Sequence, residues 1–177
     1  MSLRLLMIAS LLVCATIQAQ ETIPDIQGWS TTKWGMTEKE ILEASPGAER
    51  APGAPWLSKG VNIGIRAYTI QGTDYLVMFL LDKGGLLEKV QLSPHEIKGT
   101  RGLLMSPPVM ERLEALLVDK YGQPKVSSEE TTAGMRTSVR SWVFPHTVIE
   151  LRRIDELHFG FSIVALAYRK NGDKDKI

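Results

Sequence analysis

Residues 106–124 read SPPVMERLEALLVDKYGQP, and this stretch marks both ends of a helix. Ser106 suits the N-cap and Pro107 the first helical position, whereas Gly122 and Pro124 favour a left-handed C-cap followed by a stop. Apolar side chains recur at helical spacing, at Val109, Leu113, Leu116, Leu117 and Tyr121. We therefore expect an amphipathic helix that packs on an apolar surface.

The segments on either side of this helix have the pattern of strands. Before it, residues 61–68 alternate apolar and polar side chains, and residues 75–81 are apolar on both faces, as in a central strand. The sequence DKGG at 82–85 predicts a hairpin turn into a third strand near 86–92. After the helix, a weak edge strand is expected within 125–134, followed by alternating strands at 136–144, 147–152 and 157–168.

A shorter helix is expected before the first strands. Thr37 and Glu40 form a capping box, and Ile41, Leu42 and Ala44 give the helix an apolar side. The order helix then meander thus occurs twice, and the turns are too short for parallel crossovers. The predicted fold class is α+β, with tandem helix-plus-antiparallel-meander units and helices packed on antiparallel β-sheet.

The pattern predicts six segments along the chain. They are a signal peptide at 1–19, a lead-in at 20–28, a first α-β-β-β unit at 29–97, a connector at 98–105, a second α-β-β-β unit at 106–170 and a polar tail at 171–177.

The N-terminus is typical of a secretory signal. Arg4 precedes an apolar run at 5–13, and Ala19 offers a cleavage site after a small residue. The run is shorter than the ~20 residues that span a bilayer, so no stable membrane span is expected after cleavage. Lipidation at Cys14 is disfavoured because Val13 precedes it, where a lipobox requires Gly, Ala or Ser. We expect an exported protein, in the periplasm or outside the cell.

The composition after cleavage excludes several classes of function. The whole chain has 21 Lys and Arg against 20 Asp and Glu, and loss of Arg4 makes the two counts equal. No basic run points to nucleic acid. Cleavage also removes Cys14, the only cysteine, which excludes disulfides, a thiol nucleophile and thiolate metal ligands.

Two short motifs suggest a family. The segment GMTEKEI at 35–41 resembles the helix start of BamE-like domains, which are envelope modules with helices on a three-stranded antiparallel sheet. Gly122-Gln123-Pro124 is similar to the Gly-x-Pro that follows the helical part of such modules. Two such units in tandem also resemble β-lactamase-inhibitor-protein-like folds. This resemblance implies an envelope module that binds another protein.

No catalytic motif stands out. The histidines His95, His146 and His158 lack metal-ligand spacing, and no Gly-x-Ser-x-Gly occurs, so we predict no catalytic residue, metal or cofactor. His95 beside Glu96 could act as a base with its orienting group. His95 and His146 therefore remain an alternative polar site.

Four charged residues fall on neighbouring predicted strands, at Arg140, Glu150, Arg152 and Arg153. They could form a site for an acidic ligand. Charge pairs within the sheet explain them with fewer assumptions.

Two hypotheses about function follow. The first is an exported, non-enzymatic protein-binding or scaffold module that holds a partner in the cell envelope through an open sheet face or the loop containing Trp56. In that loop, Trp56 could instead fold back over the sheet edge. The second is a small exported hydrolase or ligand-binding protein, with a cleft between the two units near His95 and His146.

Overall fold

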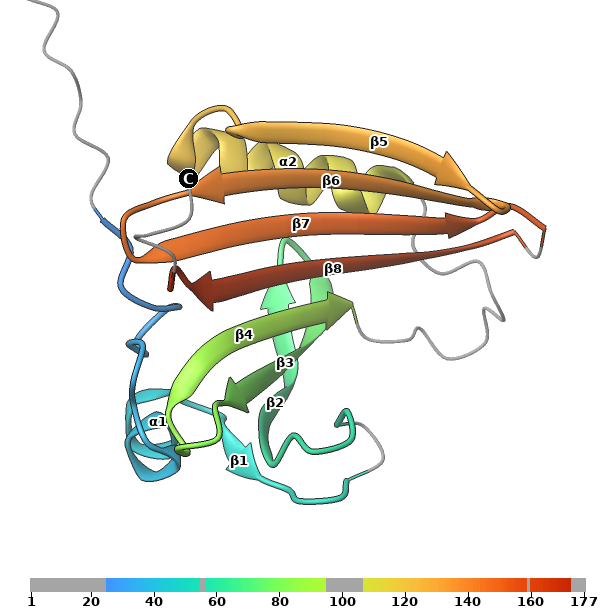
Figure 1. Cartoon of the computed structure of the whole chain (residues 1–177). Coiled ribbons are helices and arrows are strands. Elements are labelled where there is room, and N and C mark those ends of the chain that lie inside the picture. Colours follow the sequence, from blue (N-terminus) through green and yellow to red (C-terminus); the bar gives the residue numbers. More distant parts are fainter. Residues whose placement is uncertain (1–24, 55–56, 95–106, 159, 173–177) are drawn as a thin grey trace, which may run out of the picture.

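The computed structural model describes residues 25–54, 57–94, 107–158 and 160–172. One antiparallel sheet of eight strands dominates it, with two helices on one side (Figure 1). In chain order the elements are α1 (Glu38–Ala44), β1 (Glu49–Arg50), β2 (Ile63–Ile70), β3 (Thr73–Leu81), β4 (Leu87–Pro94), α2 (Pro107–Tyr121), β5 (Val126–Thr132), β6 (Met135–Val143), β7 (Thr147–Glu156) and β8 (Phe161–Lys170). The strand order across the sheet is β1-β2-β3-β4-β8-β7-β6-β5.

The expected tandem arrangement of helix-plus-meander units is wrong. β4 pairs with β8, with Val90 opposite Tyr168 and Leu92 opposite Leu166, so the two meanders form one continuous sheet. The physical reason is that both strands carry apolar residues on the same face, and pairing them removes two free edges while joining their cores. The helices, with 7 and 15 residues, are minor parts of a sheet-dominated fold. The antiparallel pairing that the short turns predict is present throughout.

The core lies on the face of the sheet that the helices cover, which we call the inner face. From α2, Met110, Leu113 and Leu117 are buried, and Ile41 of α1 is fully buried in the same cluster. The strands contribute Ile63, Ile65, Tyr75, Val77, Phe79, Val90, Leu92, Trp142, Ile149, Leu151, Val164, Leu166 and Tyr168. One core therefore runs beneath both meanders.

The sequence signals at the start of α1 and at the end of α2 are confirmed, whereas the predicted N-cap Ser106 lies outside the described residues. Glu40 donates its backbone N–H to the Thr37 hydroxyl at 3.5 Å, and the Glu40 carboxylate accepts the Thr37 N–H at 2.7 Å, which completes the capping box. At the end of α2, Gly122 adopts a φ of 76° and donates its N–H to the Val118 carbonyl at 2.8 Å. This is the left-handed C-cap that glycine favours.

The opposite, outer face is covered over only part of its width. Leu57 and Val61 pack there against Met78 of β3, together with the partly buried Leu76 and Leu80. This explains why β3 is apolar on both faces, as its sequence predicts. Over β5–β8, Figure 1 shows no described helix or loop on the outer side.

Candidate functional site

The outer face of β5–β8 is the most prominent candidate, and we call it the open face. The strand registers place Met135, Glu156 and Phe161 side by side across β6, β7 and β8. The neighbouring row contains Thr137, Ile154 and Ile163, all on the same face. The apolar side chains that are exposed or partly exposed there are Val126, Met135, Val139, Val143, Ile154, Phe161 and Ile163.

Exposure on the open face is large for side chains of this type. Ile163 is 51% exposed, Val126 49% and Met135 48%. Near the middle of the face, Arg152 forms an ion pair with Glu150 at 2.9 Å, which leaves its charge compensated. A surface that combines apolar side chains with paired charges is typical of protein interfaces.

Sequence reasoning named an open sheet face without locating it, although a signal for its location was present. The side chains of Ile163, Ala165 and Ala167 in β8 point outward, where a solvated antiparallel strand normally carries polar residues. The inward-pointing Val164 and Leu166 account for the apolar positions that a half-buried strand requires. The outward-pointing side chains are apolar as well, which that requirement does not explain. A count of apolar residues on both faces of 161–168 would have revealed it.

A second candidate is a hollow on the inner side. It measures about 870 Å³ and lies between α2, residues 25–33 and strands β2, β4 and β8. Its aromatic and basic lining consists of Trp29, Tyr68, Tyr121, Tyr168, Lys33 and Lys120. Burial raises the pKa of the Tyr168 phenol, and Tyr121 and Tyr68 act in the same direction. The phenol is therefore neutral and can offer an O–H donor, but it cannot act as a base near neutral pH.

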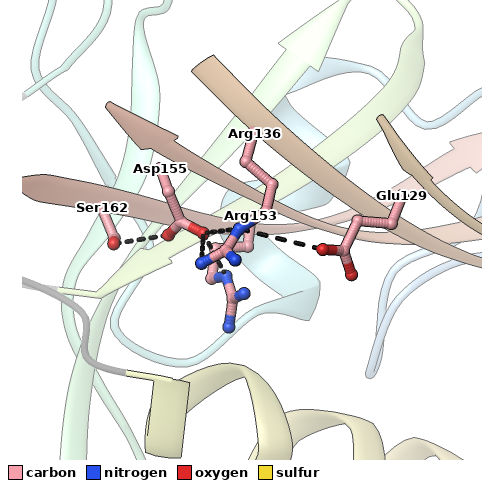
Figure 2. A network of polar contacts seen from close by, with 5 residues as sticks. All are labelled: Glu129, Arg136, Arg153, Asp155 and Ser162. Atoms are coloured by element: carbon pink, nitrogen blue, oxygen red, sulfur yellow. Dashed lines mark hydrogen bonds and ion pairs between the residues drawn. The ribbon is translucent and has the colours of Figure 1, made fainter. Parts of the chain in front are cut away.

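Figure 2 shows a polar network that connects β5, β6, β7 and β8. The carboxylate of Asp155 accepts hydrogen bonds from Arg136 at 2.9 Å, Arg153 at 3.1 Å and Ser162 at 2.6 Å. Arg136 also lies 3.8 Å from Glu129. Burial raises the pKa of Asp155, but the Ser162 hydrogen bond and the two guanidinium groups outweigh it, so the net shift is downward. Both guanidinium groups thus lie close to Asp155, which makes this part of the network structural, whereas Glu129 is held only by the longer contact with Arg136.

The predicted site at His95 and His146 stays a prediction, because the structure describes only one of its two members. His146 lies in the β6–β7 turn, where its ring contacts the Asp25 carboxylate and its backbone N–H donates to the same carboxylate at 3.2 Å. Burial raises the pKa of Asp25, but the hydrogen bonds from His146 lower it overall. His158 lies beyond the other end of β7, beside Glu156. His95 lies outside the described residues.

The four charged residues predicted on neighbouring strands form charge pairs and no site for an acidic ligand. Arg140 binds Glu114 of α2 at 2.9 Å, and Arg152 and Arg153 pair with Glu150 and Asp155 of their own strand. They are thus three separate pairs and do not converge on one site for an acidic ligand. Trp56, the predicted partner-binding residue, lies outside the described residues.

Comparison with known proteins adds no relative, since no family model, curated protein or solved structure matches this chain. Within the described residues, no group of three or more His, Cys, Asp and Glu side chains is placed to hold a metal ion. No helix in that part of the chain is long and apolar enough to cross a membrane.

Proposed function

We propose that this chain is an exported, non-enzymatic protein-binding module that holds a partner protein on the open face. The observation that carries the proposal is the exposure of Ile163, at 51%, on a face where the apolar side chains of Ile154, Phe161 and Met135 lie on the same and neighbouring strands. Burying such side chains contributes about 25 cal/mol per Å² of apolar surface removed from water. A partner with an apolar patch would gain this free energy without any change in the sheet.

Export is supported by the sequence of the first 19 residues, with Arg4, the apolar run at 5–13 and the small residue Ala19. A mature chain that begins at Gln20 would contain no cysteine, which suits an oxidising compartment. The partner would then be a protein of the cell envelope.

A matched pair of variants tests the open face. Ile163 and Leu157 have nearly equal exposure, 51% and 52%, but Leu157 lies in the β7–β8 turn. We compare the tagged chain from Gln20 with its Ile163→Lys and Leu157→Lys variants, measuring capture from an envelope extract by quantitative mass spectrometry. One partner should be recovered with the parent and with Leu157→Lys, and about tenfold less with Ile163→Lys, at an unchanged melting temperature. Equal recovery with both variants would contradict the proposal.

The inner hollow favours a second candidate function, the binding of a small apolar ligand. Leu116 lines the hollow, whereas Ala115 beside it points to solvent. A hollow of about 870 Å³ is within the range of small-molecule sites. If this function holds, Leu116→Trp should abolish the fluorescence enhancement of 1-anilinonaphthalene-8-sulfonate, and Ala115→Trp should preserve it. Equal fluorescence from the two variants would remove this candidate.

A further inference from the structure

The edge of the sheet at β5 is open along its whole length. All seven residues of Val126–Thr132 are exposed, and β5 is the last strand in the sheet order. Figure 1 shows its outer edge free of any described element. An edge strand presents unpaired backbone N–H and C=O groups, which are a template for another extended chain.

The hydrogen-bond alternation identifies the residues that present these groups. Phe144 donates its N–H to the Thr147 carbonyl at 2.8 Å. The backbone N–H and C=O groups of the even-numbered residues of β6 therefore point toward β7, and those of the odd-numbered residues point toward β5. In the register of the two strands, each even-numbered residue of β5 lies opposite an odd-numbered residue of β6. The backbone groups of the even-numbered β5 residues therefore form the hydrogen bonds to β6. The N–H and C=O groups of Ser127, Glu129 and Thr131 are left pointing away from the sheet.

This edge lacks three of the features that usually prevent pairing, namely proline, lysine and a bulge. The segment VSSEETT contains no proline and no lysine. Its register with β6 runs in step from Val126 opposite Ser141 to Thr132 opposite Met135, with no bulge. The edge does carry the two charged residues Glu129 and Glu130, so its charge decides which chains it repels.

The charges of β5 indicate which chain could pair with it. The strand contains Glu129 and Glu130, whose side chains lie on opposite faces, and no cation. The cation nearest to Glu129 is Arg136, at 3.8 Å, but Arg136 is engaged with Asp155 at 2.9 Å. Pairing of two β5 strands from separate copies would bring four carboxylates onto adjacent strands, which is unfavourable. A chain with two adjacent cations would instead compensate both carboxylates.

We propose that β5 binds an extended basic segment of the partner protein by strand addition, with adjacent cations beside Glu129 and Glu130. This inference rests on the proposed protein-binding function and specifies how the partner is held. The side chains that the added strand presents on the outer side would extend the open face next to Val126. Backbone hydrogen bonds would supply affinity, and the two carboxylates would select the sequence.

Synthetic peptides test this mode without knowledge of the partner. The probe is the end-blocked, fluorescein-labelled peptide Thr-Val-Thr-Lys-Lys-Val-Thr-Val, a strand-forming sequence with two adjacent lysines at its centre. The first control replaces both lysines with glutamate, and the second is N-methylated at alternate residues. In anisotropy titrations, the lysine peptide should bind at least about tenfold more tightly than the glutamate peptide. N-methylation should abolish binding, because it removes the donors for strand pairing.

Two variants of the chain complete the test. Ser127→Pro removes an outward N–H while leaving the bonds to β6 intact, so it should abolish peptide binding at an unchanged melting temperature. The double variant Glu129→Lys with Glu130→Lys should reverse the preference toward the glutamate peptide, and it stays informative if Ser127→Pro does not fold. Equal binding of both peptides, or none up to about 1 mM, would overturn the inference.

Two further outcomes separate this inference from the proposed function. A concentration-dependent dimer that Ser127→Pro abolishes would mean that β5 pairs with a second copy, which overturns the inference. Loss of partner capture in Ile163→Lys, together with no peptide binding to the parent chain, would also overturn strand addition at β5. The proposed binding of a partner on the open face would then still stand.

Discussion

The indole N–H of Trp34 donates to the hydroxyl of Thr147 at 2.7 Å, across 113 positions of the chain. Thr147 is fully buried, and its own hydroxyl donates to the Ile26 carbonyl. The segment before α1 is therefore attached to the first residue of β7, on the far side of the β4–β8 junction. The Thr147 hydroxyl, beside the contact of Asp25 with His146, joins the beginning of the described chain to β7.

Replacing Thr147 with valine should destabilise the protein, because the indole of Trp34 and the carbonyl of Ile26 would both lose their partner. Each unpaired buried group costs about 1–3 kcal/mol, so we expect the free energy of unfolding to fall by about 3 kcal/mol. The measurement is urea unfolding followed by tryptophan fluorescence. Thr147→Ser keeps the hydroxyl and should cost about 1 kcal/mol for the lost methyl group. Equal losses for the two variants would show that the hydrogen bonds contribute nothing.

Asp155 should make stability depend on pH at the acid end. Its pKa is lower in the folded protein than the ordinary value of 3.8, so the folded state favours the charged form. The stabilisation is fully present above the unfolded pKa, and it is lost as the pH falls below about 3.8 through the folded pKa. Asp155→Asn should remove this acid dependence and lower the free energy of unfolding by about 2 kcal/mol at pH 7.

The control for Asp155 is Glu129→Gln. Glu129 is more exposed and lies farther from Arg136, at 3.8 Å, so its loss should cost less than about 0.5 kcal/mol. The measurement is urea unfolding of both variants between pH 3 and pH 7. An acid dependence that persists in Asp155→Asn would assign it to other carboxyl groups.

Leu117 and Leu116 should differ in their contributions, although they are neighbours on α2. Leu117 is 4% exposed and packs in the core, whereas Leu116 is only partly buried beside the hollow. Leu117→Ala should lower the free energy of unfolding by about 3 kcal/mol, and Leu116→Ala by about 1 kcal/mol. Thermal unfolding of the two variants measures the difference. Equal losses would mean that α2 packs with a different face against the sheet.

Local features of this fold were predictable from the sequence because neighbouring residues determine them. The capping box at Thr37 and Glu40, the glycine C-cap at Gly122 and the hairpin turns each depend on a few consecutive residues. The inward Ile63 and Ile65 of β2 and the apolar run at 75–81 of β3 likewise follow from their own sequences, although the register shift between Ile65 and Tyr68 interrupts the alternation of β2. Such signals define elements, and they leave open which strands become neighbours.

The arrangement of the sheet was not predictable from the same signals. Nothing in the alternation of β4 distinguishes a free edge from a strand that pairs with β8, about 75 residues later in the chain. The repeated order of elements favoured two units, whereas long-range pairing produced one sheet. The open face could not be located for a related reason, since Ile163 is exposed only because no described element lies over β8.

Trp142 should stabilise the end of α2 through one hydrogen bond. Its indole N–H donates to the Gly122 carbonyl at 2.7 Å, and the side chain is 2% exposed. The last carbonyls of a helix have no partner within the helix, so this bond satisfies a group that would otherwise be unpaired. Trp142→Phe preserves most of the apolar volume but removes the donor, and it should lower the free energy of unfolding by about 1–2 kcal/mol.

Amide exchange distinguishes this local role of Trp142 from general destabilisation. Gly122 donates its N–H to Val118, so that amide should exchange faster in Trp142→Phe if the last turn of α2 loosens. Trp34→Phe, which removes the other indole bond, should leave the Gly122 amide unchanged and act instead near Thr147. Uniformly faster exchange in both variants would show that the indole of Trp142 supports the whole core, with no preference for the end of the helix.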